Sequence, residues 1–478
     1  MIDKNIAKRS DNFSQWYLDV IEAADLADYG PVKGSMVIKP NGYAIWENIQ
    51  NILNQKFKKT GVENAYFPLL IPESFLKREA EHVKGFAPEV AVVTHAGGKK
   101  LEEPVVIRPT SETIIYDSFA KWIKSYRDLP LLINQWANIV RWEMRTRLFL
   151  RTSEFLWQEG HTAHASFEEA EEREKMMINI YKEFVEEYLA IPVIAGRKTE
   201  SEKFAGAERT YAIEAMMQDG KALQSGTSHV LEQDFAKSFD VKYLDQDGQE
   251  KFVWLTSWGV STRLIGGLIM VHSDDKGLVL PPKIAPYHIV IVPVWGSDQE
   301  KLAVLDKVKD ISDKLNKIDN LVIKIDDRDL RPGPRFFEWE KKGIPIRIEI
   351  GPRDLENESV VLVRRDNGEK EIVGMNVVAN IVKEKLDLIQ KEMFERALKN
   401  REDNTYSVDT WDEFEKIFDK GSKFVMAHWC GEADCEAKIM EKTKASIRCI
   451  PFDQKEEIGK CILCGKSSQR RVLFAKCY

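Results

Sequence analysis

Apolar residues recur at helical spacing near the start of the chain. Within Asn41–Thr60 they fall on one face of a helix, at Ile45, Ile49, Ile52, Leu53 and Phe57. Gly61 follows where a helix-ending glycine belongs. The next apolar run, Ala65–Leu70, contains Pro68, which favours an edge strand or a bend over a central strand.

The following segments predict a mixture of strands and helices. We expect strands at Val105–Arg108, Ala137–Glu143 and Phe155–Glu159, a helix at Thr113–Tyr126, and a longer helix from a Ser166/Glu169 capping box to about Ala190. Further on, Phe252–Leu255 and Leu268–Val271 bracket a turn and a helix. Because strands and helices do not alternate strictly, we expect an α+β domain built on an antiparallel sheet.

A change of pattern follows the proline-rich segment Leu280–Pro286, which we interpret as a linker. Strands are predicted at His288–Val294, Leu321–Ile325 and Ile346–Ile350, helices at Ser297–Leu315 and Arg335–Lys342, and a hairpin around Asn367-Gly368. This alternation predicts a small, mostly parallel α/β domain. A long helix, Val377–Asn400, leads into the tail, so we place three domains at 1–283, 284–400 and 401–478.

Composition narrows the class of protein. The 478 residues are 43% hydrophobic and 31% charged, which is typical of a globular protein. The net charge of −7 argues against a generally basic nucleic-acid coat, although a local basic face remains compatible with it. No apolar run approaches the roughly 20 residues of a membrane helix, and Met1–Trp16 lacks a signal-peptide pattern. We therefore expect a cytoplasmic protein without a membrane span.

All six cysteines lie near the C-terminus, between Cys430 and Cys477. Four of them form two close pairs, Cys430-x₄-Cys435 and Cys461-x₂-Cys464, which is the spacing of a structural Cys₄ zinc site. A redox role for the second pair is the alternative, but no thioredoxin-like βαβ pattern surrounds it. The remaining two cysteines, Cys449 and Cys477, are expected to be ordinary thiols.

Candidate chemistry first appears on two consecutive predicted strands. The chain has no P-loop and no glycine-rich dinucleotide turn, so arginines would have to hold any nucleotide phosphates. Arg141 and Glu143 share one face of the first strand, and Trp157 and Glu159 share a face of the second, which ends at His161. Taken alone, the first pair is typical of a surface ion pair. Together, the two strands indicate a site for an amine and for a phosphate or carboxylate.

These residues carry a family resemblance. The segments Arg141–Glu143, Arg151-Thr152 and Phe155–His161 together resemble motif 2 of class II aminoacyl-tRNA synthetases, in its prolyl form. Further resemblances follow: Gly61–Pro68 to motif 1, Thr256–Arg263 to motif 3, Arg108–Glu112 to the proline-binding loop, and Gln224–His229 to a further active-site strand. The five motifs stand in the family's order and cover essentially the whole chain.

The resemblance implies an ATP site with Mg²⁺ bridging the phosphates. Arg141 would hold the α-phosphate and Arg263 the γ-phosphate as the catalytic arginines, and Glu143 would accept a hydrogen bond from the adenine amino group. The full implied set is Arg141, Glu143, Arg151, Thr152, Gln224, Thr227, Ser261 and Arg263. No side-chain nucleophile is required, because positioning and charge stabilisation suffice for phosphoryl chemistry of this kind.

The resemblance also implies a proline pocket. Its residues would be Thr110, Glu112, Arg141, Phe155, Trp157, Glu159, His161, His229 and Ser257. Glu112 suits a cationic amine, although an acid at a helix N-terminus is also favoured by the helix dipole alone. The two histidines are equally compatible with structural roles, and Trp157 with the core. Because a small apolar pocket discriminates poorly between near-isosteres, alanine and cysteine are possible wrong substrates.

The α/β region resembles the anticodon-binding domain of class IIa synthetases. Its implied anticodon residues are Phe336, Glu340, Arg347, Arg353 and Asp354. Alternatively, Arg347 and Glu349 simply alternate on a solvated strand face. Motif 1 implies a homodimer with Pro68 at the interface. The stretch 144–262 leaves no room for the large editing insertion, which resembles the archaeal/eukaryotic-like branch, whose terminal tyrosine, here Tyr478, packs towards the active site.

The resemblance therefore implies an enzyme that activates L-proline with ATP to prolyl-adenylate and transfers the prolyl group to the 3′ end of tRNA(Pro). Three alternatives remain at this stage. The first is a synthetase for threonine, histidine or glycine, and the second a non-catalytic RNA-binding paralogue. The third is a zinc-stabilised interaction module, which would leave the polar face of the two strands unexplained.

Overall fold

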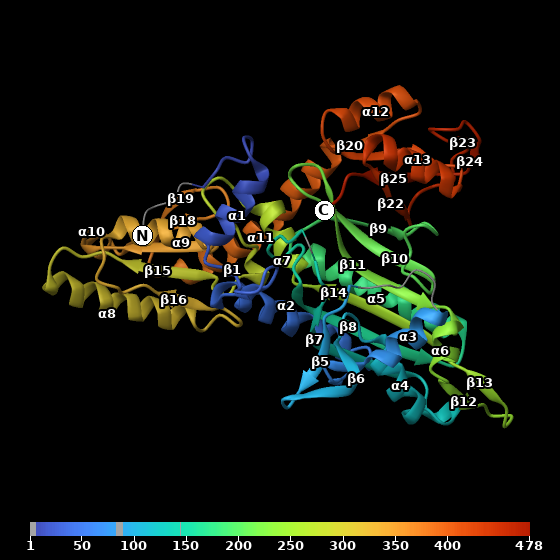
Figure 1. Ribbon diagram of the computed structural model, residues 1–478. Coiled ribbons are helices and arrows are strands. Elements are labelled where there is room, and N and C mark those ends of the chain that lie inside the picture. Colours follow the sequence, from blue (N-terminus) through green and yellow to red (C-terminus); the bar gives the residue numbers. More distant parts are fainter. Residues whose placement is uncertain (1–5, 83–88, 144) are drawn as a thin grey trace.

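The computed structural model describes residues 6–82, 89–143 and 145–478. Figure 1 shows three regions: the α/β region at one end, the antiparallel sheet at the other, and the C-terminal elements packed beside that sheet. Within the described ranges, no helix combines the length and the apolar character that crossing a bilayer requires.

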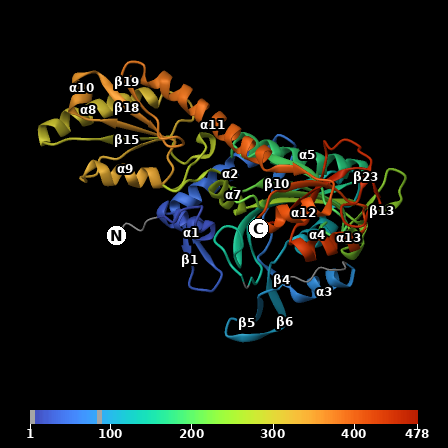
Figure 2. The ribbon, with the colours of Figure 1, turned by 90° about the horizontal axis from the view of Figure 1, so that it is seen from above.

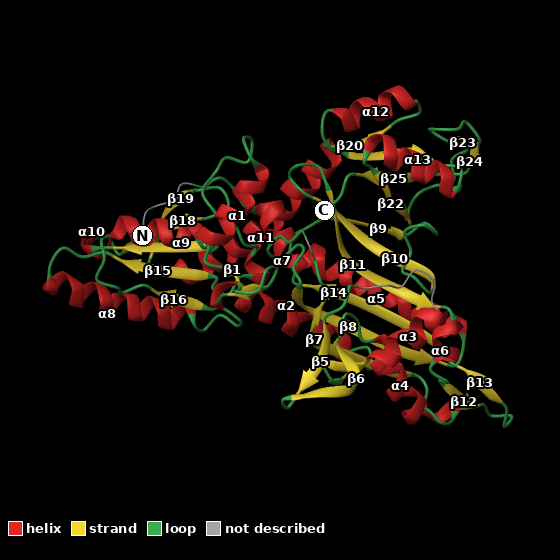
Figure 3. Ribbon diagram, in the orientation of Figure 1, coloured by secondary structure: helices red, strands yellow, loops and turns green. Residues whose placement is uncertain are grey.

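The largest sheet in the described part of the chain has eleven strands, ordered β20-β21-β25-β22-β9-β10-β11-β14-β8-β7-β3 (Figure 3). Only the two outermost pairs are parallel. Its strands are β3 (Glu63–Asn64), β7 (Leu131–Val140), β8 (Glu154–His164), β9 (Val193–Arg197), β10 (Ala207–Met216), β11 (Ala222–Leu231), β14 (Trp254–Ser261), β20 (Thr405–Ser407), β21 (Phe424–His428), β22 (Ser446–Pro451) and β25 (Arg471–Ala475). The antiparallel sheet that the sequence predicts for the first domain is confirmed.

Helices bury apolar stripes against this sheet. They are α1 (Phe13–Ala23), α2 (Pro40–Lys58), α5 (Phe167–Glu187) and α7 (Arg263–His272). The face of α2 predicted from sequence is buried in the main core, and Gly61 has the positive φ of +84° that a helix-ending glycine allows. Ser166 caps α5 by accepting the Glu169 N–H at 3.2 Å, but the Glu169 carboxylate accepts from Ala165 N rather than completing the reciprocal box.

Smaller strands and helices lie around this sheet and its helices. The strands among them are β1 (Ala27–Tyr29), β2 (Met36–Ile38), β4 (Leu70–Pro72), β5 (Val92–Ala96), β6 (Lys99–Ile107), β12 (Lys242–Leu244) and β13 (Glu250–Phe252). The helices are α3 (Glu73–His82), α4 (Glu112–Trp122), η1 (Tyr126–Asp128), α6 (Gln233–Ser238) and η2 (Pro282–Ile284). A second core, which includes Ile115, Phe119 and Phe235, joins α4 and α6 to the sheet.

Of the two alternatives predicted for Ala65–Leu70, the bend at Pro68 is confirmed: residues 65–69 are irregular, and only Leu70 belongs to a strand, β4. Two local predictions are wrong. The strand predicted at Ala137–Glu143 ends at Val140: the Arg141 N–H still bonds Ser153 O at 2.8 Å, but the Ser153 N–H bonds the Gly34 carbonyl instead of returning a bond to Arg141. The segment Leu268–Val271 belongs to α7, since its continuous apolar character reflects a helix buried all round.

The α/β region is a five-stranded mixed sheet among the described residues, ordered β16-β15-β17-β18-β19. Its elements are β15 (Ile289–Pro293), β16 (Ile323–Ile325), β17 (Ile346–Ile350), β18 (Ser359–Arg364), β19 (Lys370–Gly374), α8 (Asp298–Leu315), α9 (Pro332–Lys341) and α10 (Pro352–Glu356). Alternate residues of β15 enter two different cores, which explains its unbroken apolar run. The hairpin at Asn367-Gly368 is confirmed and makes β18 and β19 antiparallel. Because β17 and β18 are antiparallel as well, two of the four strand pairings are antiparallel and the sheet is not mostly parallel as expected.

Helix α11 (Val378–Asp403) runs from the α/β region to the eleven-stranded sheet, as Figure 2 shows. Beyond it lie α12 (Trp411–Asp419), α13 (Ala433–Thr443) and the short hairpin β23 (Gly459–Lys460) with β24 (Ser467–Ser468). The C-terminal strands β20, β21, β22 and β25 belong to the eleven-stranded sheet, because β22 pairs with β9. The close approach leaves no space for a side chain at Gly196, where a Cβ would collide with the Ile450 carbonyl.

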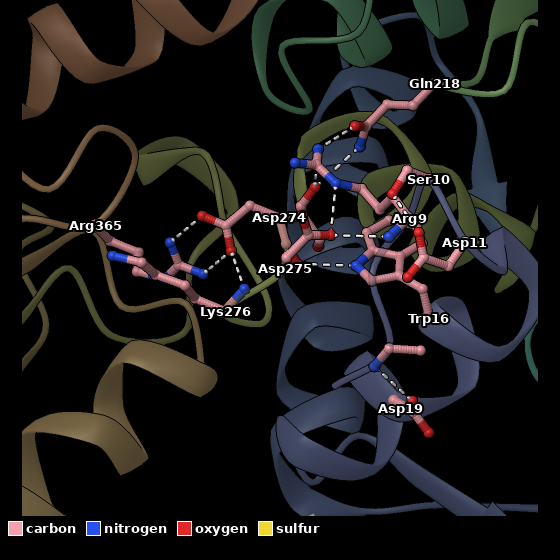
Figure 4. Close-up of polar contacts among 12 residues, drawn as sticks. Arg9, Ser10, Asp11, Trp16, Asp19, Gln218, Asp274, Asp275, Lys276 and Arg365 are labelled. Carbon is pink, nitrogen blue, oxygen red and sulfur yellow. Dashed lines mark hydrogen bonds and ion pairs between the residues drawn. The ribbon is translucent and has the colours of Figure 1, made fainter. Parts of the chain in front are cut away.

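The junction between the catalytic and α/β regions is held by charged and polar contacts (Figure 4). Arg365 donates two hydrogen bonds to Asp274, which follows α7, and Trp16 Nε1 donates to the Asp274 carbonyl at 2.9 Å. Arg9 bonds Asp275 from the other side at 3.0 Å. The segment Leu280–Pro286, which we expected to be a linker, is itself largely buried between the two regions that it joins.

Candidate active site

One cavity of about 520 Å³ opens at the centre of the antiparallel sheet. Strands β8, β10, β11 and β14 and the loop after β7 contribute its walls. It brings together all the residues predicted for ATP and proline: Thr110, Glu112, Arg141, Glu143, Arg151, Thr152, Phe155, Trp157, Glu159, His161, Gln224, Thr227, His229, Ser257, Ser261 and Arg263. The two halves of the predicted site therefore share one space.

Glu159 is the centre of a buried hydrogen-bond network at one end of the cavity. Its Oε1 accepts from Ser111 Oγ at 2.5 Å and from Gln135 Nε2 at 2.7 Å, and its Oε2 lies 3.0 Å from His161 Nε2. His161 Nδ1 in turn lies 3.2 Å from the Tyr116 hydroxyl. Both carboxylate oxygens of Glu159 are thus occupied, so this residue is suited to organising the pocket. Sequence reasoning found His161, on the same strand, but missed the contacts of Glu159 with Ser111, which precedes α4, and with Gln135 on β7.

Glu112 lies at the N-terminus of α4 and is 4% exposed. One of its carboxylate oxygens accepts a hydrogen bond from the Thr110 hydroxyl. The guanidinium of Arg141 lies near both Glu112 and Glu159: burial lowers the pKa of Arg141, whereas these two carboxylates raise it. The cavity therefore presents an anionic group beside a permanently charged arginine, which suits a zwitterionic amino acid.

Arg141 is held between the backbone and two aromatic rings. Its Nε donates to the Pro109 carbonyl at 2.9 Å, and its Cζ lies 5.9 and 5.7 Å from the ring centroids of Phe155 and Trp157. The indole Nε1 of Trp157 is buried without a hydrogen-bond partner among the described residues. Arg141 and Glu143 reach the cavity from a loop and not, as expected, from a strand face.

Three arginines converge at the other end of the cavity. Burial and the neighbouring Arg151 and Arg141 guanidiniums lower the pKa of Arg263. Arg151 Nε lies 3.5 Å from Glu143 Oε2, whose other oxygen accepts the Arg145 N–H at 2.8 Å. Mutual repulsion of like charges in a concave site is relieved by a polyanion, so this end is suited to a nucleotide triphosphate.

His229 lies on the wall formed by β10 and β11. Its Nδ1 is 2.9 Å from Thr210 Oγ1 and its Nε2 is 3.1 Å from Thr227 Oγ1, while the Phe204 ring lies 4.9 Å from the imidazole. Burial lowers the pKa of His229 to about 3, so it is neutral at physiological pH. Sequence reasoning missed Phe204 and Thr210, although Thr210 pairs with His229 across the predicted sheet.

Comparison with known proteins agrees with this geometry. The model of the tRNA synthetase class II core domain (G, H, P, S and T) matches residues 95–272. Proline–tRNA ligase 2 of Clostridioides difficile (strain 630) is 55% identical, covering 99% of this chain and 98% of the relative. Proline–tRNA ligases of Chlorobium phaeobacteroides (strain BS1) and Chlorobaculum tepidum are each 56% identical, over 99% and 100% of this chain and the same shares of their own lengths. The chain belongs to the prolyl-tRNA synthetase family.

Two further family models match the remaining regions. The anticodon binding domain model covers residues 288–385, and the prolyl-tRNA synthetase C-terminal model covers 411–478. These matches agree with the α/β architecture and the C-terminal region described above. The exact bounds at 283 and 400 stay a prediction.

A second cavity, of about 250 Å³, lies in the α/β region of this synthetase. Phe336, Glu340 and Arg347 line it, and the Arg347 Cζ stacks 4.7 Å from the Phe336 ring while Nη2 pairs with Glu349 at 2.7 Å. Arg353 and Asp354 do not line it: they lie on α10, where Asp354 Oδ2 accepts the Gly351 N–H at 2.7 Å as a helix cap. The structure therefore brings together three of the five anticodon residues predicted from sequence.

Four cysteines cluster in the C-terminal region. The sulfur atoms of Cys430, Cys435, Cys461 and Cys464 all lie within 4.8 Å of one another. Four thiolates at such separations fit a tetrahedral zinc site, because metal–sulfur bonds of about 2.3 Å place ligand sulfurs under 4 Å apart. Cys449 is buried elsewhere and Cys477 is exposed, so neither belongs to this cluster.

Hydrogen bonds between the Phe67 backbone and two buried side chains hold the turn that contains Pro68. Buried Arg108 donates to the Phe67 carbonyl at 2.7 Å, and Gln135 Oε1 accepts the Phe67 N–H at 2.6 Å. Pro68 itself is exposed, as is Tyr66 beside it, which is 70% exposed. The Gln135 side chain thus joins this turn to Glu159 in the cavity.

Proposed function

We propose that this chain is a proline–tRNA ligase, which activates L-proline with ATP and transfers it to tRNA(Pro). The single observation that supports this most is the shared cavity, in which a pocket with a buried glutamate, aromatic rings and an arginine continues into a cluster of arginines. The full-length similarity to proline–tRNA ligases supports the same substrate.

Proline would bind at the Glu159 end of the cavity. Glu112 would accept hydrogen bonds from the secondary ammonium, and Trp157 with Phe155 would cover the pyrrolidine ring. Arg141 would hold the substrate carboxylate near the α-phosphate. Glu159, His161 and Ser257 would keep the pocket in shape, and neutral His229 would close its far wall without adding a second positive charge.

ATP would bind at the arginine-rich end. A carboxylate oxygen of proline would attack the α-phosphorus, the bond to the bridging oxygen would break, and pyrophosphate would leave. Mg²⁺ bound with the ATP would neutralise phosphate charge. Arg141 and Arg263 would stabilise the charge that develops on the phosphoryl oxygens. Glu143 would accept from the adenine amino group, with Arg151, Thr152, Gln224, Thr227 and Ser261 as further ATP contacts. In the second step a terminal ribose hydroxyl of tRNA attacks the prolyl carbonyl and AMP leaves.

The second cavity would read the anticodon. Arg347 and Phe336 offer a guanidinium stacked on a ring, which suits hydrogen bonding to and stacking on an unpaired guanine. Glu340 lines the same cavity. Arg353 and Asp354 would contact neighbouring nucleotides, because both lie on α10 of the same region and the positive charge of Arg353 suits a phosphate group.

The four-cysteine cluster would hold a structural Zn²⁺. The ion would cross-link the loop after β21, helix α13 and the 461–464 turn, and would supply folding free energy rather than chemistry. We further propose a homodimer in which the exposed Pro68 turn lies at the interface. Because four thiols must stay reduced to bind zinc, we place the protein in the cytoplasm.

The test is amino-acid-dependent exchange of pyrophosphate into ATP, followed by charging of tRNA. We expect exchange with proline, weaker exchange with alanine and cysteine, and none with threonine, histidine or glycine. Charging of a tRNA(Pro) transcript is expected to fall when its anticodon guanines are replaced. Exchange with threonine and none with proline would contradict the proposal, and no exchange with any amino acid would favour a non-catalytic RNA-binding protein.

A further inference from the structure

A buried charge cluster joins the C-terminal region to the catalytic cavity. Lys198, just beyond β9, donates from Nζ to Glu214 Oε1 at 2.9 Å. Arg448, on β22 of the C-terminal region, donates to the same carboxylate from Nη2 at 3.0 Å and from Nε at 3.2 Å. The side chains of Lys198 and Glu214 are 2% and 0% exposed, and that of Arg448 is 7% exposed. Such a group of charges is costly to bury unless the partners match closely.

The backbone directs Arg448 into this position. Strand β22 has a register shift opposite β25 between Ile447 and Cys449, which leaves Arg448 as the extra residue of a bulge. Bulges re-aim the side chain of the extra residue. In addition, the Arg448 carbonyl accepts a second hydrogen bond from Lys198 Nζ at 2.8 Å. The backbone carbonyl of Arg448 therefore contacts Lys198 directly, whereas the Arg448 guanidinium acts on Lys198 through Glu214.

The cluster reaches the nucleotide end of the cavity. Lys198 lines the cavity itself. Glu214 lies opposite Gln224 in the β10–β11 ladder, and its negative charge partly offsets the lowering of the Arg263 pKa by burial and by Arg151. Two cations share one carboxylate here, so the cluster carries a net charge of +1 next to the three converging arginines. Without Arg448, Lys198 and Glu214 would neutralise each other.

We propose that Arg448 is a positioning residue for ATP: it holds Lys198 at the cavity wall and, by sharing Glu214, leaves the Lys198 charge available to attract the polyphosphate. The inference rests on the proposed function and extends it, since it gives the C-terminal region a direct part in amino-acid activation. Nucleotide binding then depends on a residue that lies 234 positions beyond Glu214 in the sequence.

The experiment measures the ATP and proline KM values in proline-dependent pyrophosphate exchange with the full-length, metal-loaded protein. In Arg448→Met the cluster becomes neutral, and the ATP KM is expected to rise about tenfold while the proline KM stays within about twofold. Arg448→Lys keeps the charge and is expected to recover most of the loss. The double variant Arg448→Met/Glu214→Gln restores the net charge through Lys198 alone and is expected to bring the ATP KM back towards the wild-type value.

The matched control is Arg471→Met. Arg471 is an ion-paired arginine of the same region, bonded to Glu457 and Asp409, and lies outside the cavity. This variant is expected to lose thermal stability with an unchanged ATP KM. If Arg448→Met raised both KM values equally, or if the double variant were worse than Arg448→Met, Arg448 would be merely structural and the inference overturned. If Arg448→Met did not fold, the double variant alone decides, because a tenfold rise there overturns it. No exchange by the wild type would instead contradict the proposed function.

Discussion

The guanidinium of Arg365 grips the carboxylate of Asp274 through two parallel hydrogen bonds of 2.7 and 2.8 Å. Arg365 lines the second cavity, and Asp274 follows α7, the helix that begins with Arg263. Although burial raises the pKa of Asp274, bonding to Arg365 lowers it below its ordinary value. This bidentate pair joins the anticodon-binding and catalytic regions of the synthetase (Figure 4).

Loss of the Arg365–Asp274 pair should let the anticodon-binding and catalytic regions unfold at different temperatures. In Arg365→Met the half-buried Asp274 carboxylate loses its bidentate partner and keeps the Lys276 N–H, which is expected to cost about 1–2 kcal/mol. We expect differential scanning calorimetry to resolve two unfolding transitions, and tRNA charging to fall more than proline-dependent exchange. Arg353→Met removes an arginine outside the junction and is the control for stability. A single transition at the wild-type temperature in Arg365→Met would show that the pair contributes nothing.

Removal of the Glu112 charge should act on proline and not on ATP. Glu112→Gln keeps the side-chain shape and its contact with Thr110 but leaves the substrate ammonium without a counter-charge. We expect the proline KM in exchange to rise about a hundredfold with an ATP KM within about threefold of wild type. Glu143→Gln, at the other end of the same cavity, should give the opposite pattern. Equal effects of both variants on both substrates would contradict the division of the cavity into two ends.

Stability should fall on acidification because His229 is buried as the neutral form. Its folded-state pKa of about 3 lies below the ordinary value of 6.5, so the unfolded chain binds the proton first as pH falls. The stabilisation is complete above pH 6.5 and is lost between 6.5 and 3, at up to about 1.4 kcal/mol per pH unit for this residue.

The matching measurement is urea denaturation of wild type and His229→Gln at pH 7.0 and 5.5. We expect the variant to be less stable at pH 7.0 and to lose less free energy of unfolding between the two values. His164 and His272, whose pKa values burial also lowers, remain as background in both proteins. Parallel pH dependence in the two proteins would show that His229 does not account for the acid sensitivity.

Metal content should follow the four clustered cysteines. Cys430→Ser is expected to reduce bound zinc from about one ion per chain to nearly none and to lower the melting temperature, because structural zinc supplies folding free energy. Cys477→Ser is the control, since Cys477 is exposed and outside the cluster. Mass-spectrometric metal analysis of both variants decides between a zinc site and free thiols. Full zinc retention in Cys430→Ser would refute the four-thiolate site.

The sequence anticipated elements with strong local signals. The helix at α2, the helix predicted at Ser297–Leu315 (α8) and the hairpin at Asn367-Gly368 form as expected, because spacing, caps and turn residues act within a few positions. The end of β7 was misplaced, because the Ser153 N–H bonds the distant Gly34 carbonyl instead of Arg141, a contact that no local pattern encodes. Likewise, Leu268–Val271 is apolar enough for a buried strand, and only its burial on all sides within α7 decides for a helix.

The candidate site shows the same division. Motif residues such as Arg141 and Glu112 were found because the family resemblance points to them. Lys198 and Thr210 were missed, since neither lies in a motif of the resemblance and each reaches the cavity only through the pairing of β9, β10 and β11. Arg448 had no signal at all, because its position depends on a bulge and on the docking of the C-terminal region against β9. Long-range pairing is what spacing along a single chain does not reveal.

The central claim is that one cavity joins a proline pocket to an ATP site through Arg141. The most direct test is proline-dependent ATP–pyrophosphate exchange by the wild type and by Arg141→Ala, with circular dichroism to establish that both are folded. The account predicts robust exchange by the wild type and a loss of at least about a thousandfold in the variant, because the guanidinium serves both substrates. Wild-type exchange that does not depend on proline, or an Arg141→Ala variant with near-normal exchange, would contradict it.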